Sequence, residues 1–292
     1  MTWLVVGCGD QPPDSQAPQT APHAEPKSPD AAAAAESLAD ARELLGVGAK
    51  ADPRKALADL TTTFGATPSD PEAAFLMARA AFRSEEPARC RTALDAYFAH
   101  EPTDHADWSA EAFVLRGWLL EHEGRPAEAL PHYEKALEVS PNYAWAMHRK
   151  GCALADTGDV PGAIDWVEKA IARRPGLLEA HFTLARLYRR ADRAADAGRE
   201  TAIHRLLNQT SDNAATTGDA MSEKYAAYEQ LEQLLPQWIE GRLVLTRMQL
   251  KLGRRELARE RLKKLVAEHP DCGEAKALLE SLARAPRDGE RR

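Results

Sequence analysis

The chain has 292 residues, of which 44% are hydrophobic and 28% charged, so it has enough apolar material to form a core. Its net charge of -7 argues against a general nucleic-acid binder, because contact with phosphates needs a basic surface. Alanine, leucine, glutamate and arginine dominate, while runs rich in Val, Ile and Thr are almost absent, which predicts an all-α fold. No apolar run in the sequence reaches the roughly 18 residues that a membrane-spanning helix needs.

Residues 1–8 end in Val5-Val6-Gly7-Cys8, which resembles the lipobox of bacterial lipoprotein precursors. That resemblance implies lipidation at Cys8 and a place in the bacterial cell envelope, facing the periplasm. Only Met-Thr-Trp-Leu precedes the box, without the positive and apolar regions of a signal peptide, so 1–8 is interpreted as a remnant of one. A cytosolic chain in which Cys8 is incidental is the alternative. Residues 9–36, rich in proline, alanine and polar residues, are expected to form a disordered linker.

Two stretches of the chain match each other at a spacing of 34 residues. Small residues and prolines recur in phase, and a third stretch follows with some loss. A fixed period of this length predicts an array of helical repeats. The positions that define it are Gly117, Ala129, Ala136, Pro141, Gly151, Ala163, Ala170, Pro175, Ala185 and Ala197.

This pattern resembles the tetratricopeptide repeat, a helix pair with small residues at the helix crossing and a closing proline. Residues 110–143 and 144–177 match it best, although Arg116 replaces the usual leucine and Leu120 the usual tyrosine. The unit from Leu178 decays, with His204 at the second alanine position and no closing proline. The resemblance implies antiparallel helix hairpins stacked as a right-handed superhelix, an α-solenoid.

The repeat template also predicts the boundaries of the array. We expect about five units over 37–211, the first two closed by Pro68 and Pro102, and then a polar loop at 212–220. Residues 221–285 are expected to hold C-terminal helices with one degenerate unit and a capping helix. A charged tail, 286–292, ends the chain.

Two kinds of glycine have a physical role in this pattern. Gly117 and Gly151 fall where the first helix of a hairpin crosses the second, and a side chain there would overpack the contact by about 1–3 kcal/mol. Gly124 and Gly158 fall at the turn within each hairpin, where a helix C-terminus favours glycine.

In tetratricopeptide arrays, certain positions of the first helix line a concave groove that holds a ligand. Carried over by position, the resemblance predicts a groove of aromatic and basic residues that would bind a peptide or protein with carboxylates and apolar anchors. The alternative is that the tryptophans pack between hairpins and the arginines form a solvated face. The predicted groove residues are Phe75, Arg79, Phe82, Trp118, Trp145, His148, Arg149, Phe182, Arg186, Arg189 and Arg190.

A second basic stretch runs from Ile239 to Leu265, where nine Lys and Arg residues accompany three Glu. We interpret it as a solvated helix surface with i,i+4 ion pairs. Contact with an acidic partner or with anionic headgroups is the alternative.

No catalytic, cofactor or metal motif occurs in the sequence. The histidines lack metal-ligand spacing, the four cysteines form no CxxC pair, and no phosphate-binding loop or nucleophile elbow is found. The sequence therefore favours a non-enzymatic scaffold for a protein or peptide partner, without cofactor, metal or nucleic acid, and touching a membrane only through a lipid anchor. A cytosolic adaptor and a regulatory subunit of a separate enzyme remain alternatives.

Overall fold

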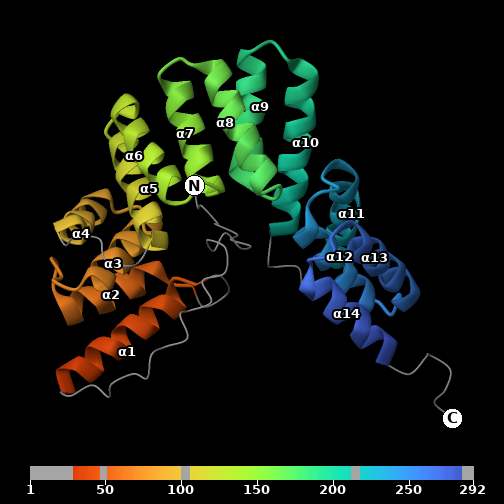
Figure 1. Ribbon diagram of the computed structural model, residues 1–292, viewed down its shortest axis with the longest axis horizontal. Helices are drawn as coiled ribbons and strands as arrows, with labels where there is room; N and C mark the ends of the chain where they lie inside the picture. The colour runs from red at the N-terminus through yellow and green to blue at the C-terminus, as the bar shows by residue number, and fades with distance from the viewer. Residues whose placement is uncertain (1–28, 47–50, 100–105, 212–217, 285–292) are drawn as a thin grey trace. The chain divides into compact units, whose positions relative to one another are not determined.

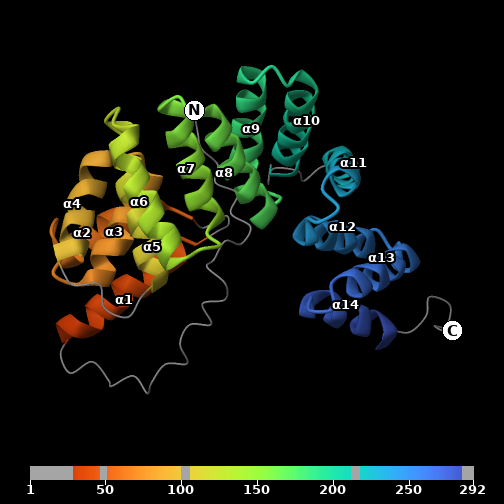
Figure 2. The same ribbon diagram turned by 45° about the horizontal axis from the view of Figure 1, so that its top comes forward.

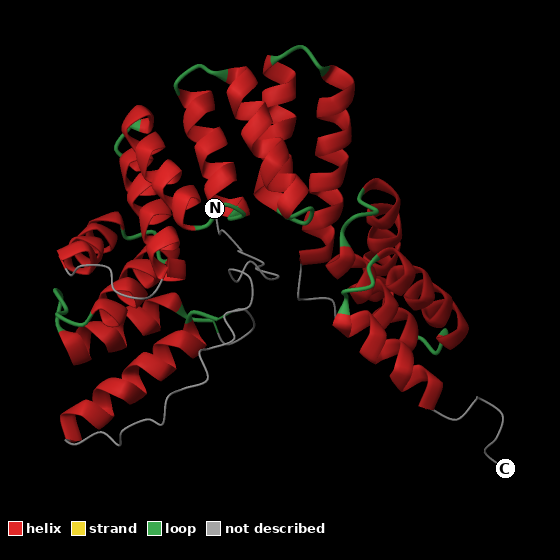
Figure 3. Cartoon of the chain, in the orientation of Figure 1, coloured by secondary structure: helices red, strands yellow, loops and turns green. Residues whose placement is uncertain are grey.

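The computed structural model describes residues 29–46, 51–99, 106–211 and 218–284. Within these ranges the chain forms fourteen helices and no strand, so the predicted all-α fold is confirmed (Figures 1 and 3). The helices are α1 Pro29–Leu44, α2 Pro53–Phe64, α3 Pro71–Arg83, α4 Pro87–Ala99, α5 Ala106–His122, α6 Pro126–Val139, α7 Ala144–Asp156, α8 Val160–Arg173, α9 Leu178–Arg190, α10 Ala194–Ser211, α11 Gly218–Leu234, α12 Ile239–Lys251, α13 Arg255–Glu268 and α14 Gly273–Arg284.

Neighbouring helices pack as hairpins, as Figures 1 and 2 show for α5 with α6 and for α7 with α8. The crossing is close because Gly117 and Gly151 have no side chain. A Cβ atom on Gly117 would lie 2.5 Å from Cε1 of Tyr133, and one on Gly151 would lie 2.6 Å from Cγ2 of Val167. The first helices of successive hairpins also touch, α1 with α3, α3 with α5 and α5 with α7, which produces an α-solenoid.

The turn inside each hairpin repeats one backbone conformation. Gly124, Gly158 and Gly253 have φ angles of 74°, 99° and 74°, in the left-handed region that glycine adopts most easily. Glu85 and Asp192, at the same place in their hairpins, have φ angles of 59° and 57°. The backbone turn is therefore kept even where the sequence has no glycine.

Several helix starts have a direct local cause. The side chains of Asp52, Asp70 and Asp159 accept hydrogen bonds from backbone N–H groups three residues later, at 3.0, 2.8 and 3.0 Å. A proline follows each cap at the first or second helical position, where its missing N–H is not needed. These caps set where α2, α3 and α8 begin.

The chain divides into two compact units. Unit 1 comprises Met1–Arg174 with Arg186–Ala194, and unit 2 comprises Pro175–Ala185 with Ala195–Arg292. In unit 1 the core joins α1 to α7 through buried alanines, leucines and aromatic side chains. In unit 2 the indole of Trp238 fills the space beside Gly176 and Gly241, where added Cβ atoms would lie 2.7 and 2.3 Å from it.

Two expected boundaries were wrong. Helix α1 begins at Pro29, so residues 29–36 are helical and not part of a linker, because proline suits a first helical position and alanine has the highest helix propensity. The loop expected at 212–220 ends earlier, because α11 begins at Gly218. The polar residues of this segment suggested a loop, although Ala220 and Met221 have high helix propensity.

Helix α10 continues to Ser211, the last residue of the expected array. Near its end the Thr210 hydroxyl donates to the Leu207 carbonyl at 2.7 Å, so a polar side chain satisfies the helix backbone. Cys8, Pro102 and the tail at 286–292 lie outside the described residues.

Candidate partner-binding face

Three aromatic side chains lie on the first helices of successive hairpins in unit 1. Phe82 on α3, Trp118 on α5 and Trp145 on α7 are all partly buried, and we call this set the aromatic face. The rings of Phe82 and Trp118 are perpendicular, with centroids 4.8 Å apart, and Trp118 stacks on His122 at 5.6 Å. Such edge-to-face pairs hold the rings in fixed orientations while part of each surface stays exposed.

Ion pairs link the same helices and engage two of the arginines expected to bind a partner. Arg79 on α3 pairs with Glu111 on α5 at 3.1 Å. Arg149 on α7 pairs with Glu121 on α5, and its guanidinium also lies 5.9 Å from the ring of Trp145. Burial lowers the pKa of Arg149 below its ordinary value. The face around the tryptophans is therefore close to neutral, and not strongly basic as the sequence predicted.

Two other arginines bind backbone carbonyls at the ends of preceding helices. The Arg83 guanidinium donates to the Leu45 carbonyl at 2.6 Å, and that of Arg190 donates to the Ala155 carbonyl at 3.2 Å. These bonds satisfy carbonyl groups at or just beyond the ends of α1 and α7. Arg190 is thus engaged within the fold, although its side chain is exposed.

Two predicted groove residues are buried, so their assignment to a contact surface was wrong. Phe75 is 2% exposed because its ring stacks on Trp108 of α5, with centroids 5.5 Å apart. His148 is 3% exposed, and its Nε2 lies 3.5 Å from the Cys152 sulfur. Neighbouring residues of the array therefore cover both side chains.

The predicted groove residues on α9 divide between the two units. Phe182, in unit 2, is 46% exposed and its ring lies 5.3 Å from that of His204. Arg186 and Arg189 are exposed in unit 1. The structure thus brings together Phe82 and Trp118, places Trp145 on the first helix of the next hairpin, and leaves the α9 residues as a separate set.

Many residues of the basic stretch at 239–265 hold unit 2 together. Arg242 is 4% exposed and donates to Glu268 of α13 at 2.6 Å, and this bond lowers the pKa of Glu268. Arg261 pairs with Glu232 of α11 at 3.0 Å, while Arg247 pairs with Glu274 of α14. Lys263 and Glu260 form a surface pair within α13, as expected for a solvated helix. The ion pairs between helices were not predicted from the sequence.

The described residues contain no group of three or more His, Cys, Asp or Glu side chains placed to hold a metal ion. Burial raises the pKa of the Cys90 thiol to about 12. His181 is fully buried, with its Nδ1 2.6 Å from Glu200 and its Nε2 2.8 Å from the Pro175 carbonyl oxygen.

None of the helices in the described ranges combines the length and the apolar composition that crossing a bilayer requires.

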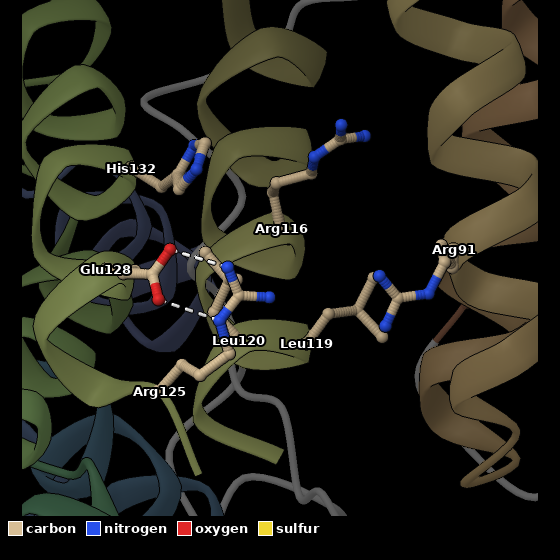
Figure 4. A pocket seen from close by; sticks show the side chains of 7 residues that line it. All are labelled: Arg91, Arg116, Leu119, Leu120, Arg125, Glu128 and His132. Carbon is tan, nitrogen blue, oxygen red and sulfur yellow. Dashed lines mark hydrogen bonds and ion pairs between the residues drawn. The ribbon is translucent and has the colours of Figure 1, made fainter. Parts of the chain in front are cut away.

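The sequence interpretation missed a cavity of about 320 Å³ between α4, α5 and α6 (Figure 4). The one signal for it was Arg116, which stands where the repeat pattern has leucine. The other basic residues come from α4, from the turn before α6 and from α6, so their spacing in the chain gives no motif. The cavity is lined by three arginines, a histidine, a glutamate and two leucines: Arg91, Arg116, Arg125, His132, Glu128, Leu119 and Leu120.

Two kinds of comparison with known proteins give matches to the chain. Solved structures similar to the chain include "MamA 41-end from Desulfovibrio magneticus RS-1", 21% identical with a TM-score of 0.48, covering 62% of this chain and 98% of that one. "Crystal structure of MamA" is 19% identical with a TM-score of 0.44, covering 55% and 91%. No curated protein matches the chain. Family models for the tetratricopeptide repeat match residues 110–143 and 243–271, so the chain contains tetratricopeptide repeats in both of its units.

Proposed function

We propose that this chain is a non-catalytic scaffold that binds a partner protein or peptide on the aromatic face. One observation supports it best. The first helices of three successive hairpins in unit 1 each carry a partly exposed aromatic ring: Phe82, Trp118 and Trp145. Large aromatic side chains are over-represented among the residues that anchor protein interfaces. Rigid rings on helices also lose little conformational entropy when a partner binds.

The chemistry around the rings favours an apolar or aromatic segment of the partner. Arg79 and Arg149 pair with Glu111 and Glu121 across the helices that carry the rings. A partner segment with spaced apolar side chains would cover the rings without breaking these pairs.

The test is a quantitative pull-down with crosslinking from cells that express the chain. The double variant Trp118→Ala/Trp145→Ala should lose the partner, with capture reduced about tenfold or more, because each anchor contributes about 2 kcal/mol when buried. The matched control is Val139→Ala on α6, an exposed apolar residue away from the face, which should leave capture unchanged. Equal capture by all three proteins would rule out the aromatic face.

We further propose that the chain is tethered to the bacterial cell envelope through a lipid on Cys8. The lipobox-like Val5-Val6-Gly7-Cys8 and the proline-rich segment after it support the proposal. Acyl labelling should mark the native protein and vanish in Cys8→Ala. Unlabelled protein in the cytosol would favour an adaptor, and a stoichiometric co-purifying enzyme would favour a regulatory subunit.

A further inference from the structure

The cavity of Figure 4 lies on the side of α5 that faces away from the aromatic face. Arg116 and Leu120 each stand two residues from Trp118, which places them about 200° around the helix from it. Arg91 reaches the cavity from α4, Arg125 from the turn before α6, and His132 from the middle of α6. A ligand in this cavity would therefore not compete with one on the aromatic face.

The three guanidinium groups of the cavity differ in how many donors they have already used. Arg125 has used the most, since Nε and one terminal nitrogen donate to Glu128 at 2.7 and 2.5 Å and the other terminal nitrogen donates to Glu123 at 2.9 Å. Arg116 uses one terminal nitrogen for Asp95 at 2.6 Å, and Arg91 uses one for Glu123. A guanidinium has five N–H donors, so Arg116 and Arg91 keep donors for a ligand.

His132 adds an unsatisfied polar atom to the cavity wall. Its Nδ1 is buried and has no hydrogen-bond partner among the described residues. Burial, with Arg116 and Lys135 nearby, lowers the pKa of His132, so the ring is neutral at pH 7. An anion bound in the cavity would stabilise the protonated ring and so raise the pKa of His132.

We propose that this cavity binds the carboxylate side chains of an acidic peptide segment from a protein partner. The unused donors of Arg91 and Arg116 would hold the carboxylate oxygens, in the way that Arg125 already holds Glu128. Leu119 and Leu120 would contact the aliphatic part of a glutamate side chain. The positive end of α6, which begins at Pro126, adds to the attraction for an anion.

The probe is a tetraglutamate peptide, titrated into the full chain at an ionic strength of about 0.15 M, where distant surface charges are screened. Binding is expected, and a tetraglutamine peptide should not bind. Arg91→Ala/Arg116→Ala should weaken the tetraglutamate Kd about tenfold or more, because both donors are lost. The charge-matched control Arg54→Ala/Arg173→Ala, with both residues exposed elsewhere in unit 1, should leave the Kd unchanged.

A second readout uses the unaltered chain. The His132 ring signals in NMR spectra should shift on adding tetraglutamate, and the pKa of His132 should rise toward its ordinary value. Trp118→Ala/Trp145→Ala should leave both readouts unchanged, so this test is separate from that of the aromatic face. The proposal is overturned if tetraglutamate does not bind or if both arginine double variants weaken it equally. Binding of inorganic phosphate without binding of the peptide would also overturn it.

Discussion

Gly117 shows how one missing side chain determines the distance between two helices. The ring of Tyr133 occupies the place where its Cβ would be, 2.5 Å from Cε1. Tyr133 is fully buried, so its ring has no free space into which to move. Gly117→Ala should therefore lower the free energy of unfolding by about 1–3 kcal/mol, measured by chemical denaturation.

Gly198 provides the matched control for Gly117→Ala, because it lies on an exposed part of α10 and its Cβ would meet no atom within 4 Å. Gly198→Ala should raise stability by about 0.5–1 kcal/mol through helix propensity alone. If Gly117→Ala stabilised the chain as Gly198→Ala does, the close crossing would not be present in solution.

Two histidines make stability depend on pH. Burial lowers the pKa of His132, with help from Arg116 and Lys135, and burial also lowers that of His204, with help from His181. In the unfolded chain both titrate near pH 6.5, so on acidification the unfolded state takes up protons that the folded state resists. This part of the stability is present above about pH 6.5 and is lost as the pH falls through the lower folded pKa values.

The double variant His132→Gln/His204→Gln should accordingly flatten the fall in stability. Denaturation midpoints of the variant and of the native chain, compared at about pH 7.5 and about pH 5.5, provide the measurement. A pH slope as steep in the variant as in the native chain would show that other groups cause it.

At the scale of the elements, the hairpin turns share a left-handed residue that the sequence does not always supply as glycine. Glu85 has φ 59°, a conformation that costs a non-glycine residue about 1–3 kcal/mol. Glu85→Gly should raise the unfolding midpoint, by an amount equivalent to about 1 kcal/mol after the entropy of the unfolded glycine is counted. Asp192→Gly should gain less, because aspartate tolerates this region. Equal or negative effects at both sites would contradict the turn geometry.

The helices were predictable from the sequence where a local cause produces them. The 34-residue spacing of Gly117 and Gly151 indicated the hairpins, because the small residues mark contacts inside one repeat. The helix over residues 29–36 was missed because an alanine run beside prolines was treated as linker composition. Glu85 and Asp192 gave no turn signal, since their left-handed backbone follows from the packing of the two helices that they join.

The candidate site was predictable only in part, because neighbouring helices decide what stays exposed. Repeat position assigned Phe82, Trp118 and Trp145 to the first helices of their hairpins, but it could not show that Trp108 covers Phe75. It also could not show that Glu121 neutralises Arg149, because that pair joins α5 to α7. Contacts between repeats therefore changed the expected chemistry of the face from basic to nearly neutral.

At the scale of the whole molecule, the described residues of unit 1 form a regular array of hairpins. Those of unit 2 form a smaller helical unit with ion pairs between its own helices. In unit 1 the pairs Arg42–Glu72, Arg79–Glu111 and Arg149–Glu121 connect the first helices in order, and they lie along the same helices as the aromatic rings. An array stabilised by contacts between neighbours can present a long surface without a central core. That arrangement suits a scaffold whose partner lies across several repeats.

Site-specific photocrosslinking from the aromatic face tests most directly whether this face is the binding surface. A photoreactive phenylalanine analogue would replace Trp118 or Trp145 in turn, and Val139 of α6 as the control. We predict that the same partner is crosslinked from both tryptophan positions and not from Val139. Crosslinking of that partner from Val139 alone, with none from either tryptophan position, would contradict the claim that the aromatic face is the binding surface.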